Sequence, residues 1–236
     1  MLNHAYQFSE HENGELALYD PFTAPWSALP ERCIIMTHWP RVPELTELWR
    51  KHGFKVVTLC RHPLDVLISV LQYAPCGSSL RWLEGASGDE RPIFGASPRS
   101  DSFLDYATGP RASALLSVSA EWWNHRGTHQ VRYETLVQEP KRQLELIARA
   151  VGVPPLVSLD EAVEACTIER LRNPVTARHF WKGQPGLWRS LMTRETALRI
   201  ASAHQSVFKT LDYTCNPDPA LAQAQVESHW TSLNAA

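Results

Sequence analysis

The chain has 236 residues, of which 44% are hydrophobic and 20% are charged, a composition typical of one globular domain with a substantial core. Its formal net charge of −2 provides no overall attraction to nucleic acid or to an anionic membrane, so any anion site must be built locally. No apolar run approaches the roughly 20 residues that cross a bilayer, and the polar, acidic N-terminus does not resemble a signal peptide.

The five cysteines are widely spaced and odd in number, and no C-x-x-C pair is present. This spacing does not fit a zinc site and indicates reduced thiols in a cytoplasmic protein. His125 and His129 are four residues apart, but the intervening Gly127-Thr128 predicts a loop rather than one helix face. We therefore expect no bound metal.

The first half of the chain alternates between predicted strands and helices. Residues 1–30 are interrupted by prolines, after which the apolar run Cys33–Met36 predicts a buried strand. Helical spacing follows over Pro43–His52, and the β-branched run Lys55–Cys60 predicts a second strand. An apolar helix is expected after Arg61-His62-Pro63. The order strand, helix, strand, helix is typical of an α/β protein with a parallel sheet and helices on its faces.

The second half continues this pattern after a surface excursion that we expect over residues 74–100. The expected elements are a helical region at 102–123 broken near Gly109-Pro110, a strand at His129–Tyr133, a helix at 141–151 closed by Gly152, a helix at 158–171, a glycine-rich loop at 179–188, and a long helix at 193–211. The last 20 residues are expected to form a loose tail. The predicted organisation is an irregular segment (1–30), an α/β domain (31–213) and a C-terminal tail (214–236).

The most informative stretch is Arg61–Ser69, which follows a predicted strand and opens a predicted helix. Pro63 suits the first helical turn, and Asp65 is favoured there by the helix dipole. Arg61 therefore lies at the carboxyl end of a strand, where open α/β sheets bind ligands, and Ser69 would present a hydroxyl to the same crevice. A guanidinium, backbone N–H groups and a hydroxyl together suit a phosphate. On this stretch alone, a surface ion pair of Arg61 explains the pattern about equally well.

The pattern R-x-P-x-D-x-x-x-S resembles the 3′-phosphate-binding motif of the sulfotransferases that use 3′-phosphoadenosine 5′-phosphosulfate (PAPS). Further segments match that family in order, namely Met36–Pro40, Ser102–Leu104 with Glu121–Trp123, Val131–Pro140 and Lys182–Trp188. Each match is weak alone, but the ordered set spans residues 31–213. The resemblance to a cytosolic-type sulfotransferase domain implies a three-layer fold like that of the P-loop NTPases, with a central parallel sheet flanked by helices, here without the first strand, loop and helix.

The resemblance also implies roles for individual residues. Arg61 and Ser69 would hold the 3′-phosphate of PAPS, the co-substrate. Lys182 and Gly183 would close over that phosphate, the lysine by its charge and the glycine by a closely approaching backbone N–H.

Two further residues would contact the nucleotide in such a protein. Tyr133 would lie beside the adenine, and Thr167 would supply a short hydroxyl contact. Ile168 stands where the family usually has an aromatic residue, so base stacking should be weaker there.

His38 stands where the family carries its catalytic base, at a predicted strand end 23 residues before Arg61. A neutral imidazole with a pKa of about 6.5 can accept a proton from an acceptor hydroxyl at neutral pH. Taken alone, His38 is better explained as a hydrogen-bonded core histidine, and the family spacing reverses that judgement. The implied reaction is in-line transfer of a sulfuryl group from PAPS to a hydroxyl or amine of a small molecule, with the protein positioning the groups and stabilising charge.

The family's 5′-phosphosulfate loop, similar to P-K-S-G-T-T-W, has no counterpart in residues 1–30, and the first lysine in the chain is Lys51. Two explanations compete: a fragment of an active enzyme, or a catalytically impaired protein that binds a nucleotide or a partner without transfer. Trp181 and Leu187 also replace the arginine and the acid that the family usually has in its late loop, which predicts weaker cofactor contacts.

A kinase-type phosphotransferase ranks last, because the G-x-x-x-x-G-K-[ST] motif is absent. The sequence has no recognisable code for the acceptor, and the family's short dimerisation motif is not matched near Arg189–Leu198. We therefore expect a small-molecule acceptor and neither nucleic acid nor a membrane as partner, while the identity of the acceptor and the oligomeric state stay open.

Overall fold

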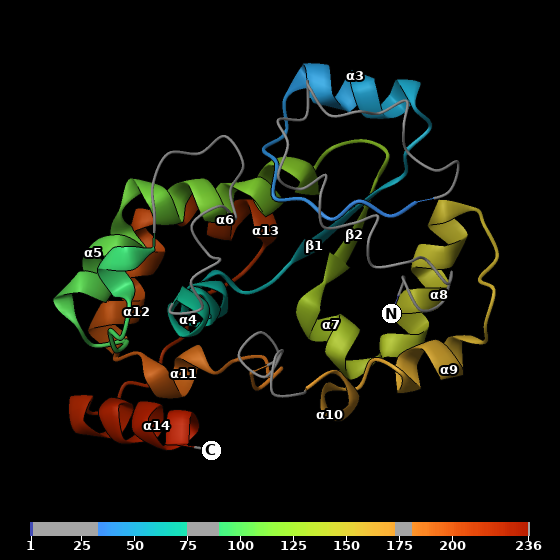
Figure 1. The fold of residues 1–236 in the computed structure, drawn as a ribbon. Coiled ribbons are helices and arrows are strands. Elements are labelled where there is room, and N and C mark those ends of the chain that lie inside the picture. Colours follow the sequence, from blue (N-terminus) through green and yellow to red (C-terminus); the bar gives the residue numbers. More distant parts are fainter. Residues whose placement is uncertain (2–32, 75–89, 173–180, 236) are drawn as a thin grey trace. The chain divides into compact units, whose positions relative to one another are not determined.

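The computed structural model describes residues 1, 33–74, 90–172 and 181–235 (Figure 1). The chain forms two compact units that are discontinuous in sequence. The described part of the first unit comprises residues 33–60, 121–172 and 181–183, together with Met1. The described part of the second comprises residues 61–74, 90–120 and 184–235.

The first unit is built on two parallel strands, β1 (Val56–Cys60) and β2 (Thr128–Arg132). In the register of this pair, Val56 lies opposite Thr128 and Cys60 opposite Arg132 (Figure 1). The first unit's helices are α3 (Pro43–Lys51), α7 (Tyr133–Gln138), α8 (Pro140–Val151), α9 (Leu159–Glu164) and α10 (Ile168–Leu171). The parallel pairing, with helices in the connection between the two strands, confirms the predicted α/β class.

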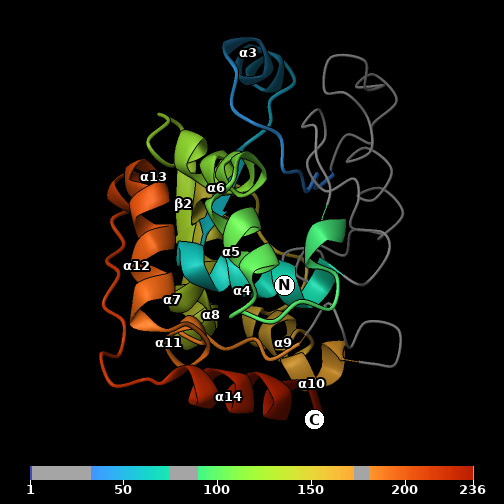
Figure 2. The same cartoon turned by 90° about the vertical axis from the view of Figure 1, so that its left-hand side faces the viewer.

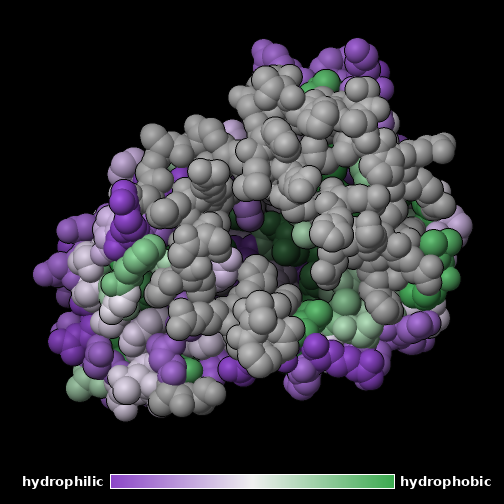
Figure 3. All heavy atoms as spheres, viewed as in Figure 1, coloured by the Kyte–Doolittle hydropathy of each residue, from purple (hydrophilic) through white to green (hydrophobic). Residues whose placement is uncertain are grey.

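Two helices of the first unit pack directly on β2, and a third packs on one of these two. Helices α7 and α8 both pack against β2, and α9 packs against α8. Leu144 and Ala162 form the buried contact between α8 and α9, and α8 ends at Gly152 in the left-handed conformation, with φ 78°. Only glycine adopts that conformation readily, so the predicted helix end is confirmed. In Figure 3 the surface over α3 is hydrophilic, in keeping with its exposed charged side chains.

The second unit is helical in the part that the structure describes. Its elements are α4 (Pro63–Tyr73), the short 3₁₀ helix η5 (Arg91–Ile93), α5 (Asp101–Thr108), α6 (Pro110–Trp123, whose last turn belongs to the first unit), α11 (Trp188–Leu191), α12 (Arg194–Ala203), α13 (Gln205–Leu211) and α14 (Gln223–Ala235). Helix α4 is apolar on nearly every side and packs against α11 and α12 (Figure 2). Helix α12 packs in turn on α5.

A buried ion pair lies in the second unit. The side chain of Glu90 is only 1% exposed, and its Oε1 accepts hydrogen bonds from Arg111 Nε at 2.7 Å and from the Tyr106 hydroxyl at 3.2 Å. Burial of the phenol, reinforced by the neighbouring Glu90 charge, raises the pKa of Tyr106, so its hydroxyl stays protonated as a donor. Glu90, Tyr106 and Arg111 thus link η5, α5 and α6, because separating Glu90 from Arg111 would leave an unpaired charge buried.

Three expectations about individual elements were wrong. Residues 33–42 form neither helix nor strand, because an apolar run becomes a strand only beside a partner, and the one sheet in the described ranges consists of β1 and β2. The predicted helix at 158–171 is two helices, separated by the extended Thr167. The predicted helix at 193–211 is also two, because the chain leaves helical geometry at His204, whose buried ring donates from Nε2 to the Ala107 carbonyl at 2.7 Å.

Two regions expected at the surface each contain buried residues. Glu90 and Ile93, within the predicted excursion 74–100, are buried, whereas residues 75–89 of that excursion lie outside the described ranges. The expected loose tail contains α14, and its Val226 is fully buried. Among the described helices, none is both long and apolar enough to cross a membrane. Nor do the described residues include a group of three or more histidine, cysteine or acidic side chains that could hold a metal ion.

Replacing Glu90 by glutamine should destabilise the protein by about 3–5 kcal/mol, because it leaves the Arg111 charge buried without its partner. The free energy of unfolding in urea measures this. Glu47→Gln is the matched control, since the Glu47–Arg50 pair is solvent-exposed and its loss should leave the free energy of unfolding nearly unchanged. Equal effects of the two substitutions would show that the buried pair carries no special weight.

Candidate nucleotide site

The turn that joins β1 to α4 has the predicted form. Strand β1 ends at Cys60, Arg61 follows, and α4 begins at Pro63 with His62 as its N-cap. The His62 Nδ1 accepts a hydrogen bond from the backbone N–H of Leu64 at 3.3 Å. The half-buried Arg61 and the exposed Ser69 thus flank the first two turns of one helix, as the sequence predicts.

The carboxylate of Asp65 binds the late loop of the second unit. Asp65 is fully buried, and its two oxygens accept from the backbone N–H of Gly186 at 2.6 Å and from that of Trp188 at 3.0 Å. A second link runs from Arg61 Nη2 to the carbonyl of Gln184 at 3.3 Å. Residues 184–188 are therefore fixed to the Arg61–Asp65 turn by three hydrogen bonds, two of them charge-assisted at a buried carboxylate.

The sequence of this loop explains why it takes that path. Gly186 has φ 81°, a left-handed conformation that favours glycine and points its N–H at Asp65. Trp188 opens α11, is almost fully buried, and stacks on the His62 ring with centroids 4.8 Å apart. The loop is thus held by a backbone turn at one end and by a large apolar side chain at the other.

Two of the predicted nucleotide-contacting residues, Gly183 and Tyr133, come together in the first unit. An ideal Cβ on Gly183 would lie 2.8 Å from Ile168 Cδ1 and 3.9 Å from the Tyr133 hydroxyl, and Gly183 has φ 63°. Only glycine suits this close approach. Thr167 is the N-cap of α10 next to Ile168, but its hydroxyl does not cap the helix. Lys182 precedes Gly183 and is half-buried.

His38 lies in an irregular segment of the first unit that tryptophans hold in place. The neighbouring Trp39 is 1% exposed, and its carbonyl accepts from Trp122 Nε1 at 3.0 Å. Trp49 stacks on Trp122 at 4.8 Å and lies 6.3 Å from Trp39. On the other side, Arg41 donates from its backbone N–H to Glu121 Oε2 at 2.9 Å. The backbone beside His38 is therefore anchored although no strand forms.

The imidazole of His38 is exposed to solvent, but the protein atoms around it displace part of its hydration. Desolvation lowers the pKa of His38 below its ordinary value of 6.5. The neutral form, which can accept a proton, is therefore favoured at neutral pH.

Sequence reasoning missed the residues that hold the site rather than form it. Asp65 was assigned only a helix-dipole role, whereas its carboxylate binds two loop amides. His62, Trp39 and Trp122 were given no role. One signal was available: Asp65 belongs to a helix that is apolar on nearly every side, and a carboxylate buried with such a helix needs donors, which a glycine-containing loop can supply.

These features define a class of protein. The sulfotransferase domain family matches residues 22–212, most of the chain, and the chain belongs to that family. The chain is also 25% identical over 180 residues to cytosolic sulfotransferase 9 of Arabidopsis thaliana, a match that covers 64% of this chain and 50% of the relative. The chain thus spans about half the length of that curated relative.

Solved sulfotransferase-fold structures resemble this one in fold. Retinol dehydratase with retinol and PAP has a TM-score of 0.54 at 18% identity, covering 81% of this chain and 58% of that one. Retinol dehydratase with androsterone and the inactive cofactor PAP gives 0.52 at 19%, covering 78% and 55%. A mouse sulfotransferase complexed with PAP gives 0.53 at 15%, covering 77% and 70%. The predicted P-loop-like α/β fold with a parallel sheet is confirmed.

Replacing Asp65 by asparagine should release the loop. The amide has one acceptor oxygen where the carboxylate has two, so its NH₂ group would face the N–H of Gly186 or of Trp188. Hydrogen exchange of the Gly186 and Trp188 amides measures this directly: both should be protected in the wild-type protein and exchange at least about tenfold faster in the variant, the loss of one charge-assisted hydrogen bond.

Asp101→Asn is the matched control, since Asp101 lies in the first turn of α5 but is exposed. It should leave both amides unchanged. Unaltered exchange in Asp65→Asn would show that the carboxylate does not hold the loop.

Proposed function

We propose that this protein binds PAPS and transfers its sulfuryl group to a hydroxyl or amine of a small-molecule acceptor, with His38 as the general base. The observation that carries the proposal is the link between the Arg61–Asp65 turn and the loop 184–188, in a chain of the sulfotransferase family. Such a link holds the Arg61 guanidinium in place before an anion binds, which lowers the entropic cost of binding.

In this proposal Arg61 and Ser69 bind the 3′-phosphate, Arg61 by a charged planar fork and Ser69 by its hydroxyl. Lys182 contributes positive charge, and Gly183 contributes a backbone N–H at a position where a Cβ would collide with Ile168. Tyr133 and Thr167 contact the adenosine end. The close approach of Gly183 to Tyr133 supports this assignment, because it places a donor-bearing backbone beside an aromatic side chain. PAP, which carries the same 3′-phosphate, is bound in each of the three similar structures.

When bound, PAPS supplies the activated sulfuryl group. His38 accepts the proton from the acceptor hydroxyl as the acceptor oxygen bonds to sulfur, while the bond from sulfur to the 5′-phosphate oxygen breaks. The products are a sulfate ester and PAP, and the imidazolium of His38 then returns its proton to water. The lowered pKa of His38 supports this role, because the imidazole begins in the proton-accepting form.

A small-molecule acceptor is the third part of the proposal. Retinol and androsterone, compounds that bear hydroxyl or carbonyl groups on an apolar skeleton, accompany PAP in two of the similar structures. An acceptor of that general class suits the proposed reaction, because the reaction requires of the acceptor only a nucleophilic oxygen or nitrogen.

Calorimetric titration with PAP tests the nucleotide site. Arg61→Ala should weaken PAP binding about 10- to 100-fold, the loss of a charge-assisted contact, and should leave the affinity for adenosine 5′-phosphate, which has no 3′-phosphate, unchanged. Arg50→Ala, in an exposed ion pair, is the control and should bind both nucleotides as the wild type does. A folded protein that takes up no PAP would contradict the proposal.

The pH dependence of turnover tests His38. Because its neutral form accepts the proton and its pKa lies below 6.5, kcat/KM should be flat at neutral pH and fall as the pH drops through that lower pKa. His38→Gln should reduce kcat by about 10²–10⁴-fold without changing PAP affinity, whereas the exposed His52→Gln should have no effect.

Transfer is measured with labelled PAPS and a panel of simple phenols, alcohols and amines. Normal PAP binding without transfer to any member of that panel, or to water, would favour the alternative of a nucleotide-binding protein that does not catalyse transfer.

A further inference from the structure

The segment after the family match contains a helix that packs on α11, the helix that follows the loop 184–188. The match ends at residue 212, where Asp212 turns the chain out of α13 with φ 54°. The C-terminal segment (residues 213–235) then includes α14, which packs on α11 and whose Val226 is completely buried. In Figures 1 and 2, α14 runs beside α11, the short helix that begins with Trp188.

Hydrogen bonds connect this segment to both parts of the proposed phosphate site. The Thr214 carbonyl accepts from His62 Nε2 at 3.1 Å, and the Asn216 carbonyl accepts from the Arg189 guanidinium. From α14, His229 Nδ1 donates to the Ser190 carbonyl at 3.0 Å. One bond thus reaches the turn next to Arg61, and two reach α11 directly after the Asp65-bound loop.

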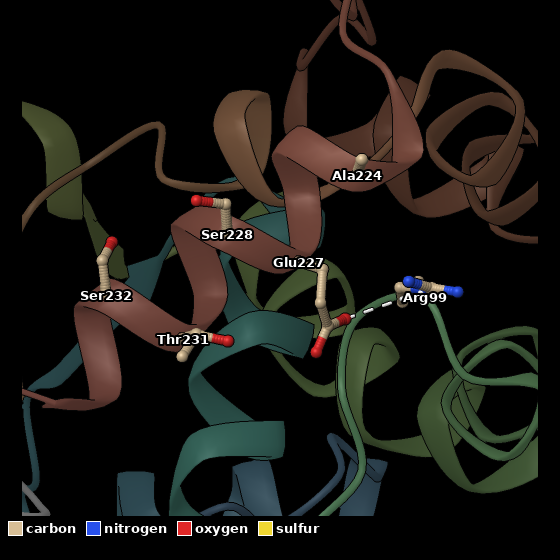
Figure 4. Close-up of a pocket in the computed structure, with 6 residues that line it drawn as sticks. All are labelled: Arg99, Ala224, Glu227, Ser228, Thr231 and Ser232. Carbon is tan, nitrogen blue, oxygen red and sulfur yellow. Dashed lines mark ion pairs between the residues drawn. The ribbon is translucent and has the colours of Figure 1, made fainter.

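The outer side of α14 makes weaker contacts. Glu227 lies 3.9 Å from Arg99, and both side chains are more than 40% exposed, so this ion pair contributes little to stability. A shallow pocket of about 560 Å³ opens there among hydroxyl-bearing side chains (Figure 4). The stronger contacts of α14 are therefore on the side that faces α11.

His62 is the residue at which these contacts meet. A carbonyl oxygen only accepts, so His62 Nε2 carries the proton that it donates to Thr214, and Nδ1 is left as the acceptor for the Leu64 N–H. Both ring nitrogens are thus used in one neutral tautomer. The ring also contacts three aromatic side chains from different parts of the second unit, namely Trp188 at 4.8 Å, Tyr213 at 5.2 Å and Phe208 at 5.5 Å.

We propose that His62 is a positioning residue through which the C-terminal segment holds Arg61 and the loop 184–188 in their phosphate-binding arrangement. The inference rests on the proposed binding of a 3′-phosphate by Arg61. His62 is the next residue in the chain after Arg61, so its side-chain contacts fix the backbone from which the guanidinium extends. Its stacking on Trp188 fixes the far end of the loop whose other contacts are to Asp65.

The decisive variant is His62→Asn. Asparagine is a strong N-cap and keeps an acceptor for the Leu64 N–H, but it is too short to donate to Thr214 and has no ring to stack on Trp188. It should weaken PAP binding about three- to tenfold, the range expected for one lost hydrogen bond, while leaving the affinity for adenosine 5′-phosphate unchanged. The ratio of the two dissociation constants is therefore the readout.

Two further variants separate positioning from folding. His229→Ala breaks a contact of α14 without altering the Arg61 turn and should shift the ratio in the same direction, by a smaller factor. Ser100→Ala removes the N-cap of α5, whose side chain accepts from the Phe103 N–H, and should lower the melting temperature without moving the ratio.

Each result decides the inference. A lower PAP preference in His62→Asn and His229→Ala, but not in Ser100→Ala, establishes it. A wild-type ratio in both histidine variants, with Arg61→Ala still defective, overturns it and leaves the proposed function standing. Loss of PAP preference in Ser100→Ala as well would show a general effect of stability and would also overturn it. If Arg61→Ala binds PAP as tightly as the wild type does, Arg61 does not bind the 3′-phosphate, and both proposals are wrong.

Discussion

The arrangement of the Arg61 turn and the loop 184–188 depends on one buried carboxylate, that of Asp65. Asp65 has no contact with solvent, and burying its oxygens is unfavourable unless donors replace the water they lose. The N–H groups of Gly186 and Trp188 are those donors. Two backbone segments separated by about 120 residues are thereby required to meet, and the loop cannot leave without stranding a buried acceptor. The position of Arg61, of the loop, and of α11 with α14 against it all follow from this requirement.

In the first unit, His38, the proposed general base, lies on irregular backbone that must be fixed by other means. His38 lies in no helix or strand, so a sheet cannot position it. Large aromatic side chains do so instead: Trp39 is buried beside it, and the indole of Trp122 donates to the Trp39 carbonyl. Aromatic residues suit this task because they bury a large area with few rotatable bonds. The imidazole therefore stays at the solvent boundary while its backbone is fixed.

Local chemistry made much of the fold predictable. Helix α4 follows from Pro63 and an apolar run, β1 from a β-branched run, and the end of α8 from Gly152, since each depends on neighbouring residues alone. The errors have non-local causes. Cys33–Met36 is as apolar as a strand but pairs with none in the described ranges, and a partner cannot be read from the segment itself. The break at His204 depends on the carbonyl of Ala107, 97 residues earlier.

The candidate site was predictable to a similar degree. Spacing and resemblance identified the residues expected to touch a nucleotide, such as Arg61 and Lys182. They did not identify Asp65 and His62 as the groups that fix the Arg61 turn and the loop 184–188, because a supporting residue is recognised by its partners and not by its type. The packed C-terminal helix was missed for a related reason: a polar helix with a single buried valine, Val226, has almost no apolar periodicity to detect.

The most direct test of this account is a double-mutant cycle between Asp65→Asn and Arg61→Ala, with PAP affinity measured by calorimetry. If the Asp65 carboxylate holds the loop in place for the phosphate that Arg61 binds, Asp65→Asn should weaken PAP binding about tenfold or more in the wild-type background and much less in the Arg61→Ala background. Equal losses in both backgrounds, or no loss in either, would contradict the claim that the buried carboxylate organises the phosphate site.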